Sequence, residues 1–180
     1  MNWIWIITVL LTACLLQVVF GNAMLALPLH TAAVFYFAVS TRGVAPAVVA
    51  LPLAGTLDAL LLHRGFPCVL SAGAALGIAA FWRRHGTCRF RIAQTAPGAV
   101  LGLSTALIHL ANTALLIDPR VDGPWTHNVL YATGMLMAGA ILAPILCLVL
   151  DACASRLGLP RFRDARTHSD EFDHGPLPES

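Results

Sequence analysis

A stretch of 26 uncharged residues runs from residue 92 to residue 117, with the sequence IAQTAPGAVLGLSTALIHLANTALLI. No Asp, Glu, Lys or Arg occurs between Arg91 and Asp118. An α-helix of about 20 mostly apolar residues can cross the roughly 30 Å hydrocarbon core of a bilayer. The stretch therefore predicts a transmembrane helix that is long enough to tilt.

Further apolar runs flank this stretch and cover approximately residues 3–20, 22–41, 44–62, 66–82 and 128–150. Hydrophobic residues make up 58% of the 180 positions and charged residues 11%, whereas a soluble domain usually carries about 25% charged residues. We therefore predict an all-α, polytopic membrane protein with six transmembrane helices in one bundle. The alternative is an apolar soluble bundle, but no periodic polar face is present to cover its outside.

The arginines fall mainly on one side of this scheme, in which successive loops alternate across the membrane. One side receives Arg64 and Arg120. The other side receives all the remaining arginines, which are Arg42, Arg83, Arg84, Arg89, Arg91, Arg156, Arg161, Arg163 and Arg166. Because loops rich in Arg and Lys stay in the cytoplasm, both termini are predicted to lie inside.

This scheme divides the chain into a membrane domain over residues 1–155 and a cytoplasmic tail over residues 156–180. The tail is basic through Arg166 and then acidic, and its polar sequence predicts that it is largely disordered. The basic loop over residues 83–91 and the start of the tail are expected to meet membrane lipids or cytoplasmic partners. Nucleic-acid binding is not expected, since no folded basic domain is left to carry it.

Asp58 is the one acidic residue inside a predicted span. A charged carboxylate at mid-membrane costs about 2.5–3.5 kcal/mol, so Asp58 needs a partner, a water pocket or a proton. In one interpretation Asp58 is a proton or substrate site or a polar hinge, and together with Gly55 it shapes the polar interior of the bundle. In the other it lies near the outer end of its span and reaches water past His63 and Arg64.

Two more polar residues, His109 and Asn112, are three positions apart and share one face of the predicted fifth helix. They are interpreted as interhelical hydrogen-bonding groups, and a bond between His109 and Asp58 is conceivable. Such bonds contribute about 0.6–2 kcal/mol in membrane bundles. Asp151, at a span end, is expected to pair with Arg156 or to reach the interface.

Small residues and prolines mark the predicted helix contacts. Gly73 with Gly77, and Gly98 with Gly102, form two GxxxG pairs. This spacing allows close helix packing, so both pairs are predicted to lie at contacts inside the bundle. Pro28 is expected to open the second helix, and Pro46 and Pro52 are expected to break the third.

Catalytic templates are missing from the sequence. It contains no HExxH pair, no GxSxG elbow and no P-loop. Its five cysteines show no metal-binding spacing. We therefore expect no catalytic residue, no metal and no cofactor, and an intramembrane enzyme would lack a nucleophile–base pair.

The first half of the chain resembles the bacterial rod shape-determining MreD family over roughly residues 3–85. Four features carry the resemblance: Cys14-Leu15-Leu16-Gln17 closing the first span, Pro28 opening the second, the basic turn Thr41-Arg42, and Gly55-Thr56-Leu57-Asp58 followed by a loop at Gly65. The family often has glycine four positions before the aspartate, where this chain has Ala54. Small or polar residues usually follow the aspartate there, whereas Leu60, Leu61 and Leu62 follow it here.

The resemblance implies a non-catalytic scaffold of the cell-elongation machinery in the bacterial inner membrane, where it supports peptidoglycan synthesis and rod shape. It implies MreC-like, RodA-like and penicillin-binding proteins as partners. It also implies a fold similar to the substrate-binding subunit of energy-coupling-factor transporters. The alternative function is therefore such a subunit of a vitamin or small-solute importer, which the prolines of the third span and the polar set Asp58, His109 and Asn112 also suggest.

Overall fold

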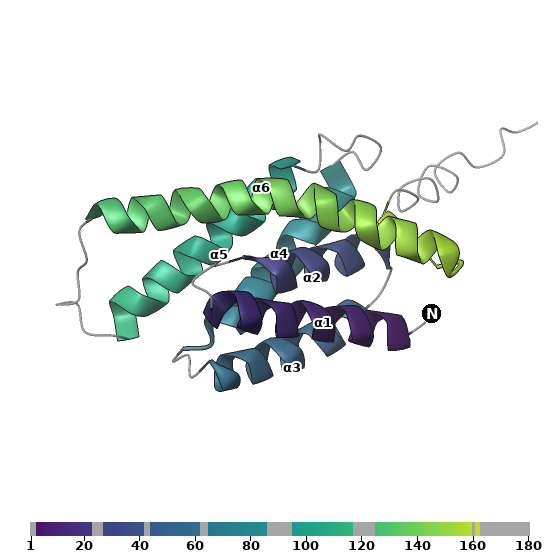
Figure 1. Cartoon of the computed structure of the whole chain (residues 1–180), viewed down its shortest axis with the longest axis horizontal. Helices are drawn as coiled ribbons and strands as arrows, with labels where there is room; N and C mark the ends of the chain where they lie inside the picture. The colour runs from purple at the N-terminus through teal and green to yellow at the C-terminus, as the bar shows by residue number, and fades with distance from the viewer. Residues whose placement is uncertain are drawn as a thin grey trace, which may run out of the picture.

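The computed structural model describes residues 3–22, 27–41, 44–61, 65–85, 95–116, 125–159 and 161–162. Over these residues the chain is all-helical, as predicted, and contains no strand (Figure 1). The helices are α1 (Trp3–Asn22), α2 (Leu29–Ser40), α3 (Ala45–Leu60), α4 (Pro67–His85), α5 (Thr95–Leu116) and α6 (Trp125–Arg156).

Three of these helices are long and apolar enough to cross a membrane, namely α1, α5 and α6. The helices α2 and α3 are apolar but have only 12 and 16 residues. At 1.5 Å per residue they are about 18 and 24 Å long, which is less than the roughly 30 Å of hydrocarbon. Length and hydropathy therefore support three of the six predicted spans.

The helix α2 is short because both of its ends are set by local chemistry. Pro28 precedes its first residue. Because proline has no N–H group to donate to the preceding turn, the helix does not extend to earlier residues. At the other end Thr41 adopts an extended conformation, and both its N–H and its Oγ1 donate to the Phe37 carbonyl. The prediction that the second helix begins at Pro28 is confirmed.

The same helix forms the centre of the molecule. Every residue from Leu29 to Ser40 is buried, and α2 contacts all five other helices. Its largest side chains, Phe35, Tyr36 and Phe37, are almost completely enclosed. Figure 1 shows α2 between α1 and α6. Its backbone and side chains therefore meet protein, and the other helices form the outside of the bundle.

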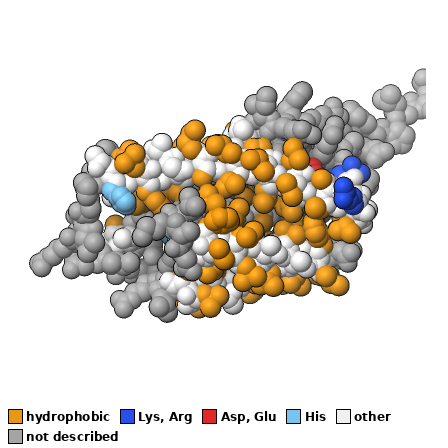
Figure 2. Space-filling model, viewed as in Figure 1, with side chains coloured by type: hydrophobic (Ala, Val, Ile, Leu, Met, Phe, Trp, Pro, Cys, Tyr) orange, Lys and Arg blue, Asp and Glu red, His pale blue; other side chains and the backbone are white. Residues whose placement is uncertain are grey.

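The outside of the bundle is apolar. Large hydrophobic side chains are exposed on α1, α3, α4, α5 and α6, including Ile4, Leu60, Phe81, Leu115 and Leu130. Figure 2 shows them spread over the face of the molecule, with Arg side chains gathered at one end. Soluble monomers rarely expose apolar surface on this scale, which is consistent with a membrane location.

The helices α5 and α6 approach each other through glycine. A Cβ atom added to Gly98 would collide with the backbone of Gly139, and one added to Gly102 would collide with the backbone of Met135. Here the GxxxG pair lies at a helix contact inside the bundle, where small residues let two backbones meet.

The other GxxxG pair lies elsewhere, and the prediction of a contact inside the bundle is wrong for it. A Cβ atom added to Gly73 or Gly77 would meet nothing within 4 Å. The face of α4 that packs against its neighbours carries Ser71, Ala72, Ala75 and Ala79. The two glycines are exposed because they lie on the other side of the helix.

The third helix also differs from the prediction. Pro46 lies in the first turn of α3, where its missing N–H costs nothing. Pro52 lies inside α3, and the helix continues through it to Leu60. The predicted break is therefore absent, and Pro144 is similarly contained within a continuous α6.

We expect Gly102→Ala to destabilise the protein, because the added methyl group must push α5 and α6 apart. Overpacking of this kind costs about 1–3 kcal/mol. Thermal unfolding in detergent, followed by circular dichroism, should show a lower midpoint for this variant. The matched control is Gly77→Ala, which adds the same group in open space and should unfold like the wild type. Equal midpoints for all three proteins would contradict the α5–α6 contact.

Candidate functional site

Asp58 lies near the end of α3 and is fully buried. Its Oδ1 accepts a hydrogen bond from the backbone N–H of Cys68 at 2.9 Å, and its Oδ2 accepts one from the N–H of Val69 at 3.0 Å. These N–H groups belong to the first turn of α4, which Pro67 opens. The carboxyl group of one helix thus binds the start of the next.

The first turn of a helix has N–H groups without partners inside the helix. Pro67 has no N–H, so the first donors of α4 are those of Cys68 and Val69, and Asp58 accepts from both. A carboxyl group at this position also complements the positive end of the helix dipole. The side chain of Asp58, which belongs to α3, therefore caps the N-terminus of α4 and connects the two helices.

The chain turns sharply between these helices. Gly65 has φ of 81° and Phe66 has φ of 55°, so both adopt the left-handed region. Glycine tolerates this conformation, whereas a residue such as Phe rarely adopts it. The two residues direct Pro67 back towards α3, which brings the first amides of α4 to Asp58.

The other predicted polar residues are less buried than Asp58. Gly55 is half-buried, and a Cβ atom added to it would lie in ordinary contact, 3.8 Å from Val69 Cγ2. His109 and Asn112 are half-buried on α5, and the carbonyl of His109 accepts a hydrogen bond from Thr113 Oγ1 at 2.9 Å. Arg83 and Arg84 are exposed in the last turn of α4. Arg89 and Arg91 lie outside the described residues.

A similar contact joins α1 to α2, and the sequence reasoning missed its role. Gln17 Oε1 accepts a hydrogen bond from the backbone N–H of His30, at 3.0 Å. His30 lies in the first turn of α2, two positions after Pro28. Its side chain is 1% exposed, and its Nε2 has no hydrogen-bond partner in the described part of the chain.

A third contact lies at the end of α6. Asp151 Oδ1 accepts hydrogen bonds from the hydroxyl of Tyr36 at 2.9 Å and from the backbone N–H of Phe162 at 2.8 Å. The expected partner Arg156 is exposed one turn further on. The described partners of Asp151 therefore come from the central helix and from the segment that follows α6.

Phe162 lies in the basic part of the predicted tail, before Arg166. Its side chain is fully buried, and its ring centroid lies 5.8 Å from that of Phe35 and 6.1 Å from that of Tyr36. This part of the tail thus places an aromatic residue in the core, a contact that the sequence reasoning did not predict. Residues 163–180 lie outside the described residues.

The contacts of Asp58 and Asp151 share a sequence pattern. Each aspartate is followed by alanine, and then, at the same spacing in both, by a glycine and a proline: Gly65 and Pro67, and Gly158 and Pro160. Both glycines have positive φ, 81° and 66°. In both cases the carboxyl group accepts from the N–H two residues after the proline. This repeated spacing was the signal that could have revealed both contacts from the sequence.

The arrangement supplies acceptors for helix and segment starts, and it holds adjacent elements together. No group of three or more His, Cys, Asp or Glu residues in the described ranges is placed to hold a metal ion. The geometry thus assigns Gln17, Asp58 and Asp151 to connections between elements.

Asp58→Leu should destabilise the protein, because it leaves the N–H groups of Cys68 and Val69 without acceptors inside the bundle. A buried donor left unpaired costs about 1–3 kcal/mol. Asp58→Asn retains one carbonyl oxygen and should lose less. Thermal unfolding in detergent measures both changes. If Asp58→Leu unfolded at the wild-type temperature, the capping role of Asp58 would be refuted.

Comparisons with known proteins assign no family. No family model matches the chain, and no curated protein and no solved structure matches it. Its function is therefore inferred from its own residues and their geometry.

Proposed function

We propose that the protein is a multi-pass protein of the bacterial inner membrane, in which all six helices are embedded and both termini lie in the cytoplasm. The apolar outside of the bundle and the length of α1, α5 and α6 support this placement. The shortness of α2 is compatible with it, because protein covers this helix on all sides.

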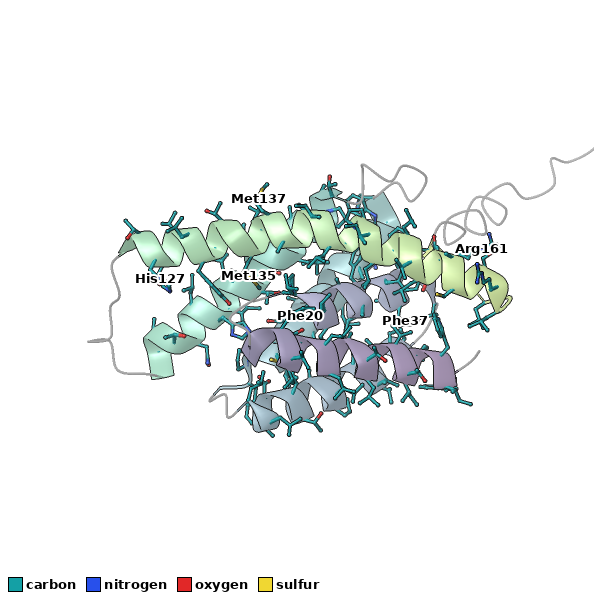
Figure 3. All side chains as sticks on the ribbon, in the orientation of Figure 1. Phe20, Phe37, His127, Met135, Met137 and Arg161 are labelled. Carbon is teal, nitrogen blue, oxygen red and sulfur yellow. The ribbon has the colours of Figure 1, made fainter. Side chains whose placement is uncertain are left out.

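The proposed orientation places nine of the eleven arginines in the cytoplasm and leaves Arg64 and Arg120 on the other side. Arg161 lies at the same end of the bundle as the start of α1 (Figures 1 and 3), whereas His127 lies at the opposite end (Figure 3). Arg83, Arg84 and Arg156 are exposed in the last turns of α4 and α6. In this orientation they meet anionic lipid headgroups or cytoplasmic partners.

Within this membrane, the proposed function is that of a non-catalytic scaffold of the cell-elongation machinery. The observation that supports this function is the role of Asp58, which is the aspartate of the signature Gly55-Thr56-Leu57-Asp58 in the resemblance to the MreD family. Its two oxygens bind the amides of Cys68 and Val69, so the signature serves to join helices. Such a bundle would act by docking other membrane proteins, for which MreC-like, RodA-like and penicillin-binding proteins are the proposed partners.

The importer alternative has weaker support. A substrate-binding subunit needs room for a ligand among its helices. Here α2 occupies the centre of the bundle, and all of its residues are buried. The polar groups of Asp58 and Gln17 are directed to backbone amides of α4 and α2.

The orientation predicts the outcome of reporter fusions in a bacterial host. A cytoplasmic reporter joined after residue 88 should be active, and one joined after residue 120 should be inactive. A periplasmic reporter should give the reverse pattern at the same two positions. The reason is that arginine-rich loops stay in the cytoplasm. The loop at residues 83–91 holds four arginines, whereas the loop at residues 118–127 holds one. Periplasmic activity after residue 88 would invert the proposed topology.

The scaffold function predicts specific partners and a cell-shape phenotype. Depletion of the protein in its native host should turn rods into rounded cells, because peptidoglycan synthesis along the cell wall would lose its membrane scaffold. The tagged protein, cross-linked in native membranes, should retain MreC-like and RodA-like proteins. Cells complemented with Gly77→Ala, a surface change that leaves folding intact, provide the control. Normal rods together with a transport ATPase among the retained proteins would favour the importer.

A further inference from the structure

The segment that follows α6 is attached to the bundle at one residue. Leu157, Gly158 and Arg161 are exposed, and Leu159 is half-buried. Phe162 alone among the residues described beyond α6 is fully buried. Its ring lies against Phe35 and Tyr36 of the central helix (ring centroids 5.8 and 6.1 Å apart).

The turn before this attachment is held by its own hydrogen bonds. The N–H of Leu159 donates to the carbonyl of Ala154 at 2.9 Å, and Gly158 has φ of 66°. This is the pattern of a helix C-cap with a left-handed glycine. The end of α6 is therefore complete without Phe162, and release of Phe162 would leave the helix intact.

Asp151 also keeps a hydrogen-bond donor when Phe162 leaves. Its Oδ1 accepts from both the Tyr36 hydroxyl and the Phe162 N–H. Loss of the second donor leaves the first in place, so the carboxyl group would keep a partner in the bundle. Opening of this contact would thus avoid leaving the half-buried carboxyl group of Asp151 without a hydrogen bond inside the bundle.

We propose that Asp151, Tyr36 and Phe162 form a latch, which holds the start of the C-terminal segment against the central helix and can open without unfolding the bundle. In the closed state the Arg161–Phe162 peptide bond is fixed at the protein core. In the open state this bond becomes accessible, and the aromatic surface of Phe35 and Tyr36 is uncovered. Through the latch, binding to the C-terminal segment would affect the central helix α2. The latch does not depend on the proposed scaffold function.

Limited trypsin digestion of the full chain in detergent, with the fragments identified by mass spectrometry, tests the latch. Cleavage after Arg161 requires Phe162 to leave the core, so the rate at this bond follows the population of the open state. We expect Phe162→Ala to raise this rate roughly tenfold or more, since a large buried contact is removed. Tyr36→Phe retains the ring and removes the hydroxyl, so that opening would take the remaining described donor from Asp151, and it should lower the rate by roughly two- to tenfold.

Cleavage after Arg83 and Arg84, in the last turn of α4, reports on the rest of the bundle in the same digest. It should keep the wild-type rate in both variants. Leu130→Ala removes an exposed apolar side chain of α6 and serves as the control, with wild-type cleavage after Arg161. If Phe162→Ala fails to fold, Tyr36→Phe decides the question, because it leaves the aromatic packing in place.

Two results would overturn the latch. In the first, Phe162→Ala does not accelerate cleavage after Arg161 and Tyr36→Phe does not slow it, which would mean that the contact does not control the segment. In the second, cleavage after Arg83 and Arg84 rises by the same factor as cleavage after Arg161. Phe162 would then be an ordinary core residue whose loss loosens the whole bundle.

Discussion

Backbone amides at the start of a buried helix need acceptors, because a buried polar group without a partner costs free energy. This protein meets the requirement with side chains from neighbouring helices. Asp58 serves α4 and Gln17 serves α2, while Asp151 serves the segment at Phe162. Each acceptor thereby fixes where the following element begins and which helix it lies beside. The path of the chain through the bundle depends on these three contacts.

The contacts also explain how a helix as short as α2 can form the centre of the molecule. Its twelve residues are all buried, so its whole length is packed against protein. Its first turn is bound by Gln17, and its other half presents Tyr36 to Asp151. The other five helices pack around it and carry apolar side chains outward. The bundle is thus organised around a helix that is enclosed by protein.

Glycine pairs show why identical local sequences take different roles. Gly98 and Gly102 lie where α5 and α6 meet, and any side chain there would strike the opposite backbone. Gly73 and Gly77 have the same spacing but face open space. The spacing places two glycines on the same face of a helix, so that another helix can approach this face closely. Which face meets a neighbour depends on the positions of the other helices, and no single helix contains that information.

Composition and patterning alone determined that the chain is all-helical, where its helices lie approximately, and that Pro28 opens the second one. These features follow from local chemistry, because apolar length and proline act within one segment. The sequence also marked Asp58 as a residue in need of a partner. Only the tertiary structure decided that the partner is the first turn of α4 and that Phe162 returns to the core. It likewise decided that α3 continues through Pro52. The physical reason is that hydrogen-bond partners and packing surfaces distant in sequence are brought together only when the helices assemble.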